Sequence, residues 1–548
     1  MVRNLLSKAE IFVIVLLAIV PLFIHLPYRV NIFLSWEGAY RISEGQLPFR
    51  DFGTPLGGMY WVIPAIFFKV FGAKMISLIK AQVFINIISG LAFRSILISL
   101  DVNKGIRQAA VLLFCISYSF FNFWPWYNHS VIVYELAALA CLFKYTAGGH
   151  SKYHIGWLPA AALLTVCSFL TKQDGGGMAF GLSAALLAVY GFTERKWKAL
   201  IVYLGSFVLI LLVVIGPFLH SGFGYWFNHG QAPHTARVSV MDIAEEFFNG
   251  SQWIKFYFFI TLVLAVARFR HFKGWQAERN AILLLVLTWG ILGEAAVFQV
   301  TSYTPPDNNI FFHGFGFVCV FSMLGSMAQL DFGKPGLLAA LSVGILLWWS
   351  GTWWKYTQRV LAKALPAKVE TRTADGLVKS PNGENVVNRS TYMINRDTVS
   401  DVPMEQWIEC GLRSFDKINM PAPTVDGIHR LMKMPLVYES KGDLRVLNMS
   451  ELTPLAAEIP YRLERNPGLP LWYHLGVGMF NRQVDSFSRR IAEHHYDLIL
   501  YEYIPNLNNF YPWPIRDSLR AHYKLVDSFM APRRGPETKG DIEVYIKP

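Results

Sequence analysis

Residues 35–61 read SWEGAYRISEGQLPFRDFGTPLGGMYW and follow directly after the first long apolar run of the chain. The segment combines three acidic residues, Glu37, Glu44 and Asp51, with several glycines and prolines. Carboxylates are costly inside a bilayer, so residues of this kind near an apolar run are retained for function or for pairing. The pattern indicates a polar loop at the edge of a membrane.

The composition of the whole chain supports a membrane protein. Of 548 residues, 53% are hydrophobic and only 16% are charged, whereas a soluble domain carries about 25% charged residues. The mean hydropathy is +0.32. Apolar runs of roughly 18 residues or more are long enough to cross a bilayer as helices. The sequence predicts a multi-span α-helical protein with about eleven spans, whose cores lie near 10–28, 75–98, 108–124, 130–147, 155–171, 176–192, 199–219, 253–268, 280–299, 313–330 and 335–353.

The basic residues predict the orientation of these spans. With the N-terminus in the cytoplasm, the cytoplasmic connections hold most of them, and the positive-inside rule favours this arrangement. The net charge of +12 then lies beside anionic lipid. These residues are scattered and no recognition motif accompanies them, so the sequence indicates no nucleic-acid partner. They are Arg94, Lys104, Arg107, Lys144, Lys152, Arg195, Lys196, Lys198, Arg268, Arg270, Lys273, Arg279 and Lys334.

An odd number of spans places the chain after Trp354 on the external side. We expect a transmembrane domain at 1–354, a connector at 355–400 and a soluble external domain at 401–548. Helical and strand patterns alternate in the last part, which predicts a small α/β domain. Helix is expected at 404–415, and strands are expected at 444–449, near 500, near 526 and at 542–548. The five cysteines show no C-x-x-C spacing and do not indicate a zinc site.

The first external loop, about residues 28–74, contains two amphipathic parts. EGAYRISEG (37–45) places Glu37 and Arg41 four residues apart, which suits an ion pair on a short helix at the membrane surface. LGGMYWVIPAIFFKVFG (56–72) is apolar, but its length and Pro64 favour a helix lying on the surface. We therefore expect two interfacial helices in this loop.

This loop resembles the first external loop of the polyprenyl-phosphate-sugar-dependent glycosyltransferases of the C superfamily. That family includes protein O-mannosyltransferases and the aminoarabinose transferases of lipid A. The matching elements are Glu37, GAYRISEG, GQLPFRDF, TPLGGMYW and FKVFG. The resemblance covers about residues 30–100, and the remaining spans match only as a hydropathy profile. The leading acid of the family pattern is usually Asp, so Glu37 reaches one methylene further.

The resemblance implies an inverting enzyme that moves a sugar from a lipid phosphate to an acceptor at the external face of a bacterial inner membrane. The acceptor is a lipid, a glycan or a protein. Such a transfer needs a base for the acceptor's proton and cations for the departing phosphate. We expect Glu37 to be the base, Asp51 to be a second catalytic residue that contacts the acceptor or a metal, and Arg41 to lie at the donor phosphate. The alternative for Glu37 is a solvated acid paired with Arg41.

Two further cations are assigned to the donor phosphate by the same resemblance. Lys172 lies in LTKQDGGG (170–177), where glycine amides could also face a phosphate. The alternative is a lysine that extends to the membrane surface. His313 precedes the tenth span in YTPPDNNIFFHGFG (303–316), and its alternative is a hydrogen-bonded anchor.

Other polar residues of the external connections are expected to line the substrate site: Tyr127, Asn128, His129, Asp174, Asn308 and Asn309. Glu294 lies within a span and is therefore either functional or paired. A divalent cation is used by some relatives and not by others, and the sequence does not decide between them.

Two other classes of function compete with the transferase. A transporter or flippase of lipid-linked sugars would show related halves or paired broken helices, and the sequence shows neither. A polysaccharide polymerase or ligase shares the multi-span topology but places its long functional loop later in the chain.

Overall fold

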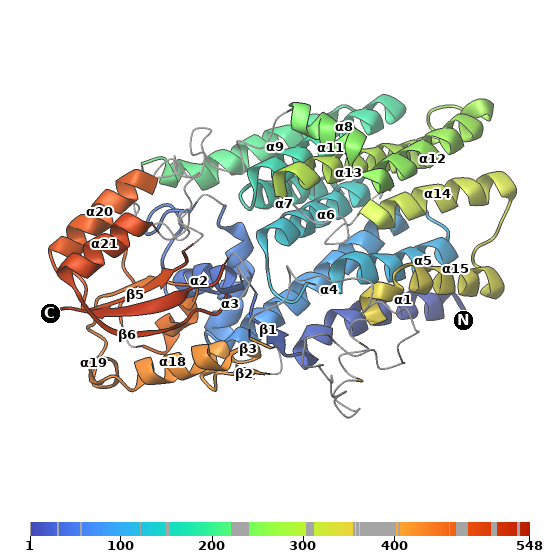
Figure 1. The fold of residues 1–548 in the computed structure, drawn as a ribbon. Coiled ribbons are helices and arrows are strands. Elements are labelled where there is room, and N and C mark those ends of the chain that lie inside the picture. Colours follow the sequence, from blue (N-terminus) through green and yellow to red (C-terminus); the bar gives the residue numbers. More distant parts are fainter. Residues whose placement is uncertain are drawn as a thin grey trace.

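The computed structural model describes residues 2–29, 32–54, 57–120, 122–148, 154–220, 240–302, 312–354, 357, 361, 402–403, 406–459, 461–466, 480–505, 512–533 and 538–548. Figure 1 shows the apolar helices gathered as a bundle, with the strands and helices of the C-terminal part at one end. The short helices α2 and α3 lie between these two parts (Figure 1). The helices of the first external loop therefore lie between the bundle and the C-terminal part.

Each of the eleven predicted apolar runs overlaps a helix of the bundle. The helices are α1 (Val2–Ala18), α4 (Met75–Ser99), α5 (Lys104–Phe114), α6 (Tyr127–Thr146), α7 (Trp157–Phe169), α8 (Gln173–Glu194), α9 (Lys198–Ile215), α12 (Gln252–Arg268), α13 (Arg279–Ser302), α14 (Phe312–Ala328) and α15 (Pro335–Trp348). A π-helical turn, η3 (Cys115–Ser119), extends α5, and α11 (Val240–Asn249) precedes α12 at an angle of 80°.

The prediction for the first run, 10–28, was wrong in its second half. The α1 helix ends at Ala18, a 3-10 turn η1 (Val20–Phe23) follows, and Leu26–Pro27 form the strand β1. Pro21 explains the end of the helix, because proline lacks an N–H and its ring clashes with the carbonyl four residues earlier.

Four of the described helices are long and apolar enough to cross a membrane: Met75–Ser99, Gln173–Glu194, Lys198–Phe218 and Arg279–Thr301. The bent pair α11 and α12 would make a fifth. The other apolar helices are shorter, so the number of eleven crossings remains a prediction.

Both predicted helices of the first external loop are present. The first is α2 (Ile32–Ser43), and the second consists of η2 (Met59–Trp61) continued by α3 (Val62–Phe71). They pack closely, because a Cβ atom at Gly38 would overlap the indole ring of Trp61. Only glycine fits at this position, immediately beside Glu37.

The C-terminal part contains two small sheets. The strand order is β1-β3-β2 in the first, with β2 (Trp407–Glu409) and β3 (Ile418–Pro421). The order is β4-β5-β7-β6 in the second, with β4 (Val446–Met449), β5 (Leu498–Tyr503), β6 (Lys524–Met530) and β7 (Asp541–Ile546). The helices are α18 (Ala422–Met432), α19 (Pro435–Tyr438), α20 (Phe480–Ala492) and α21 (Trp513–His522).

The four predicted strands of this part are confirmed as β4, β5, β6 and β7. The helix predicted at 404–415 was wrong. Trp407–Glu409 pair antiparallel with β3, and residues Arg413–Phe415 form only the 3-10 turn η9. Pairing with a strand distant in the sequence overrides the local helical pattern here.

The segment that leads into the first external loop shares a sheet with the C-terminal part, and the loop itself shares a hydrophobic core with that part. β1 pairs in parallel with β3, and the N–H groups of Leu26 and Tyr28 donate to the carbonyls of Lys417 and Asn419 at 2.9 and 2.8 Å. Side chains of α2 and of β3 are buried in the same cluster. The helix α2 is thus fixed against the C-terminal part as well as against the bundle.

Candidate functional site

The Glu37–Arg41 pair on α2 forms the centre of the candidate site. Arg41 Nε and Nη2 each lie 2.9 Å from Glu37 Oε1, as the spacing of four residues predicted. The side chains of Glu37 and Arg41 are only 15% and 10% exposed. Among the residues that the structure describes, Glu37 Oε2 has no hydrogen-bond partner. One oxygen of a nearly buried carboxylate is therefore available for chemistry.

The surroundings of Glu37 shift its proton affinity upward. Burial raises the pKa of Glu37 above the ordinary value of 4.5, and the opposite charge and hydrogen bond of Arg41 only partly offset this effect. A carboxylate with a raised pKa is a better general base than an ordinary one.

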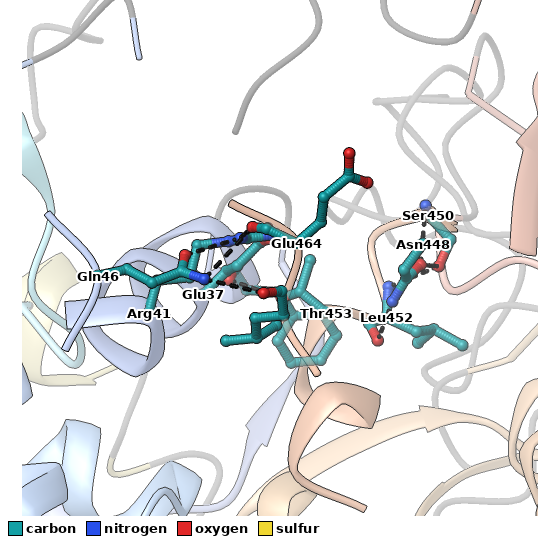
Figure 2. A network of polar contacts seen from close by, with 10 residues as sticks. Glu37, Arg41, Gln46, Asn448, Ser450, Leu452, Thr453 and Glu464 are labelled. Atoms are coloured by element: carbon teal, nitrogen blue, oxygen red, sulfur yellow. Dashed lines mark hydrogen bonds and ion pairs between the residues drawn. The ribbon is translucent and has the colours of Figure 1, made fainter. Parts of the chain in front are cut away.

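A segment of the C-terminal part lies over this pair, and we call residues 461–466 the cover segment. Arg41 Nη1 donates to the carbonyl of Glu464 at 3.3 Å and to Gln46 Oε1 at 3.1 Å. Gln46 Nε2 donates to the carbonyls of Leu463 and Glu464 at 3.1 and 3.3 Å. Figure 2 shows Glu37, Arg41 and Gln46 facing Glu464. These contacts engage all three nitrogens of the Arg41 side chain. Arg41 was expected to bind the donor phosphate, and that role remains a prediction.

Asp51 has a different environment. Its Oδ2 accepts from the backbone N–H of Leu47 at 2.8 Å and from Arg50 Nη2 at 2.6 Å. Burial raises its pKa, but the bonds from Arg50 and Leu47 outweigh this, so the pKa lies below 3.8. A carboxylate that accepts these bonds is a weak base, and its visible role is to close the turn after α2.

Lys172 lies at the start of α8 and is buried, with 3% of its side chain exposed. Its Nζ lies 2.9 Å from Asp174 Oδ2, 4.9 Å from the centre of the Phe298 ring and 6.0 Å from that of Tyr127. This burial does not fit a lysine that extends to the membrane surface, but it does fit a cation held inside a site.

Aromatic side chains connect the neighbourhood of Glu37 to that of Lys172. Tyr60 is buried, its ring lies 6.1 Å from that of Tyr127, and Tyr127 in turn lies beside Lys172. Burial raises the pKa of the Tyr60 phenol, and the nearby Tyr127 and Glu37 raise it further. The position of Tyr60 between Glu37 and Tyr127 could not be predicted from its place in the loop motif.

The first external loop is docked directly on the end of α7, next to Lys172. A Cβ atom at Gly57 would clash with the carbonyl oxygen of Leu170, and the N–H of Met59 donates to that oxygen at 3.4 Å. The hydroxyl of Tyr134 donates to the carbonyl of Met59 at 3.1 Å. The two connections predicted to carry the base and the phosphate ligand therefore meet.

His129 and Asn128 are both buried at the start of α6. The Nδ1 atom of His129 lies 3.4 Å from Gln82 Nε2, and its ring lies 4.8 Å from that of Tyr118. These contacts place His129 against α4 and η3 inside the bundle. Of the residues expected to line the substrate site, Tyr127 and Asp174 contact Lys172 directly.

His313 is surrounded by aromatic side chains at the start of α14. Its Nδ1 lies 3.4 Å from the hydroxyl of Tyr257, and its ring lies 5.2 Å from Trp253 and 4.9 Å from Trp349. These contacts come from α12 and from the end of α15, rather than from the elements that carry Glu37 and Lys172. Its role at the donor phosphate remains a prediction, and Asn308 and Asn309 lie outside the described residues.

Two buried carboxyl groups meet inside the bundle. Glu294 on α13 lies against Glu135 on α6. Neither carboxylate oxygen of Glu294 has a hydrogen-bond partner among the described residues. Glu294 therefore lies beside a second carboxyl group and has no cationic partner among the described residues, and its functional role stays a prediction. Within the described ranges no three His, Cys, Asp or Glu side chains are arranged to hold a metal ion.

The fold was compared with known proteins. No model of a protein family matches this sequence, and no curated protein matches it. Among solved structures, ArnT from Cupriavidus metallidurans superposes over 99% of this chain and 98% of its own, with a TM-score of 0.50 and 12% identity. This chain has the GT-C glycosyltransferase fold. The family resemblance of the first loop is thereby confirmed at the level of the fold.

Two other GT-C proteins match less of their own length. The mycobacterial arabinofuranosyltransferase AftD matches over 99% of this chain and 41% of its own, with a TM-score of 0.44 and 12% identity. The Archaeoglobus fulgidus oligosaccharyltransferase matches over 61% and 53%, with a TM-score of 0.34 and 12% identity. This chain therefore spans about half the length of these two relatives or less. A second structure of ArnT contains undecaprenyl phosphate.

Proposed function

We propose that this protein is an integral-membrane glycosyltransferase. It transfers a sugar from a polyprenyl-phosphate donor to a lipid, glycan or protein acceptor at the external face of the membrane, with inversion at the anomeric carbon. The observation that carries the proposal is the state of Glu37: a nearly buried carboxylate with a raised pKa and one free oxygen, on a helix between the bundle and the C-terminal part.

Glu37 supplies the base in this mechanism. Its Oε2 takes the proton from the acceptor hydroxyl as that oxygen attacks the anomeric carbon of the donor sugar. The bond between this carbon and the phosphate oxygen breaks, and the electron pair leaves with the lipid phosphate. Because the base and the leaving group lie on opposite sides of the sugar, the configuration inverts. A positioned base contributes about 10²- to 10⁴-fold to such a step.

Lys172 neutralises the departing phosphate. Its ammonium group is buried, and Asp174 is its counter-ion at 2.9 Å. In a site shielded from water, a fixed cation stabilises developing negative charge more than it would in solution. The lipid phosphate that leaves belongs to the same class as the undecaprenyl phosphate seen in ArnT. His313 and Arg41 remain candidates for the same phosphate, with weaker support from their contacts.

The proposed topology has a cytoplasmic N-terminus and an external C-terminal part in a bacterial inner membrane. The basic residues at the end of the bundle opposite the first loop support it. Reporter fusions after Lys198 and after Pro548 should give opposite signals, cytoplasmic for the first and external for the second. Equal signals at both points would overturn this orientation, together with the placing of Glu37 and Lys172 at the external face.

Full-length protein purified in detergent tests the activity. It is incubated with radiolabelled polyprenyl-phosphate sugars and a membrane extract as the source of acceptors. We expect label to move from the lipid donor to an acceptor, and release of free sugar in the absence of the extract. Saturable binding of the donors without any turnover would contradict the proposal and would favour a transporter of lipid-linked sugars.

A further inference from the structure

Arg41 forms polar contacts on two sides of its guanidinium group. On one side, two of its nitrogens contact a single oxygen of Glu37 at 2.9 Å. On the other side, Nη1 donates to Gln46 Oε1 and to the backbone carbonyl of Glu464. The direction of the guanidinium group, and with it the orientation of the Glu37 carboxylate, therefore depends on a residue more than 400 positions away in the sequence.

The cover segment also contacts the first loop beside this pair. Tyr461 is partly buried and lies close enough to Arg41, Glu37 and Tyr40 for all three to affect the pKa of its phenol, which desolvation raises most. At the other end of the segment, the N–H of Asn466 donates to the carbonyl of Asp51 at 2.7 Å. The segment thus spans the loop from the catalytic helix to the turn that follows it.

The side chain of Glu464 anchors the cover segment to the C-terminal part. Arg490 on α20 forms an ion pair with one of its oxygens, and the hydroxyl of Tyr496 donates to the other at 3.1 Å. Arg490 Nη1 also donates to the hydroxyl of Tyr496 at 3.4 Å. The backbone carbonyl of Glu464 accepts from Arg41, while its side chain contacts Arg490 of α20 and Tyr496, which lies two residues before β5. Figure 2 shows the side chain of Glu464 pointing away from Glu37 and Arg41.

We propose that the C-terminal part completes the catalytic site, with Glu464 as a positioning residue that acts through Arg41 to orient Glu37. The inference rests on the proposed role of Glu37 as the base. Releasing Glu464 from Arg490 and Tyr496 would loosen the cover segment, deprive Arg41 of a backbone acceptor and weaken its hold on Glu37. The carboxylate would then lose part of the opposite charge that offsets its burial.

The test uses the full-length protein with Glu464→Ala, Glu464→Gln and a matched control. Gln keeps the size of the side chain and its hydrogen bonding but loses the ion pair with Arg490. Asp527→Asn is the control, because it removes a carboxylate from another ion pair of the C-terminal part, with Arg430 at 3.0 Å. That pair joins α18 to β6 and is more exposed than the Glu464 pair.

The first measurement does not depend on turnover. Dicyclohexylcarbodiimide labels protonated buried carboxyl groups, and the fraction of labelled Glu37 is followed by peptide mass spectrometry between pH 4 and pH 9. We expect the midpoint of labelling to rise by about one pH unit in Glu464→Ala and by less in Glu464→Gln. The control should keep the wild-type midpoint. A wild-type midpoint in Glu464→Ala overturns the inference, and so does an equal rise in the control.

The second measurement is the rate of sugar loss from radiolabelled undecaprenyl-phosphate sugar. We expect kcat to fall about 10-fold in Glu464→Ala, with partial recovery in Glu464→Gln and a donor KM within about two-fold of wild type. If Glu464→Ala does not accumulate, Glu464→Gln decides, and wild-type values of both midpoint and kcat overturn the inference. If the wild-type protein turns over no donor, the proposed function fails, while the labelling midpoints still decide whether Glu464 positions Arg41 against Glu37.

Discussion

Two glutamates at opposite ends of the bundle, one buried and one nearly buried, are paired with arginine in different ways. Glu10 on α1 is fully buried and both of its oxygens are engaged, one by Arg94 Nε at 2.6 Å and the other by Arg107 Nε at 2.8 Å. Glu37 on α2 has one arginine, Arg41, which uses one oxygen only. Arginines from two helices of the bundle thus bond both oxygens of Glu10, whereas one oxygen of Glu37 has no partner among the described residues.

This difference distinguishes a structural ion pair at Glu10 from the proposed site of chemistry at Glu37. A buried carboxylate with both oxygens bonded has nothing left to offer a substrate, and it stabilises the contacts of α1 with α4 and α5. A buried carboxylate with one free oxygen has an incomplete environment, which a substrate hydroxyl can complete. The burial of a charged residue is therefore less informative than the number of its oxygens that are already occupied.

The largest expected effect on stability lies at Glu10. Glu10→Gln leaves Arg94 and Arg107 without their counter-charge, and breaking a buried ion pair from one side costs about 3–5 kcal/mol. We expect a strongly lowered Tm in detergent, with normal turnover per folded molecule. Glu44→Gln makes the same chemical change at an exposed position of the first loop and should leave Tm unchanged. A wild-type Tm for Glu10→Gln would contradict the structural role of the Glu10 ion pairs.

A smaller effect is expected on donor binding at Lys172. Because Lys172 is buried against Asp174, the single change Lys172→Met would leave a buried carboxylate unpaired. The double variant Lys172→Met with Asp174→Asn avoids this. Relative to Asp174→Asn alone, it should bind undecaprenyl phosphate about 10- to 100-fold more weakly, as the loss of a charge-assisted bond of about 1.5–3 kcal/mol implies. Equal affinity of the two variants would reject the phosphate role.

The local features of the fold could be predicted from the sequence. Apolar runs predicted the bundle helices, and the spacing of Glu37 and Arg41 predicted their ion pair, because both depend on residues near in the sequence. The pairing of β1 with β3 could not be predicted, since Leu26 and Ile418 are almost 400 positions apart and β1 is only two residues long. The cover segment was missed for the same reason.

The candidate site shows the same limit. The motif of the first loop predicted a catalytic role for Glu37, and Lys172 was predicted at the donor phosphate because it is a cation in a connection expected to be external. That Tyr60 and Tyr127 lie between them could not be read from the sequence, because aromatic residues at a membrane edge usually serve as anchors. The proximity of Glu294 to Glu135 could not be predicted either, since Glu135 lies on a helix far away in the sequence.

The smallest expected effect is a shift in the pH dependence. The base must be ionised to accept a proton, so kcat/KM rises with pH through the pKa of the free base. Burial raises the pKa of Glu37 above 4.5, whereas hydrogen bonds hold that of Asp51 below 3.8. We expect the acid limb of the kcat/KM profile to lie above pH 4.5 and to move in Glu37→Asp. A flat profile down to pH 4 would favour Asp51 as the base.

The measurement that tests the central claim most directly compares donor binding and sugar transfer in one preparation of Glu37→Gln. The amide keeps the shape of the side chain but cannot accept the proton. We predict that transfer from radiolabelled undecaprenyl-phosphate sugar falls by about 10²- to 10⁴-fold, while binding of undecaprenyl phosphate stays within about two-fold of wild type. Glu37→Asp should retain partial activity, well above that of Gln. Wild-type transfer by Glu37→Gln would contradict the account.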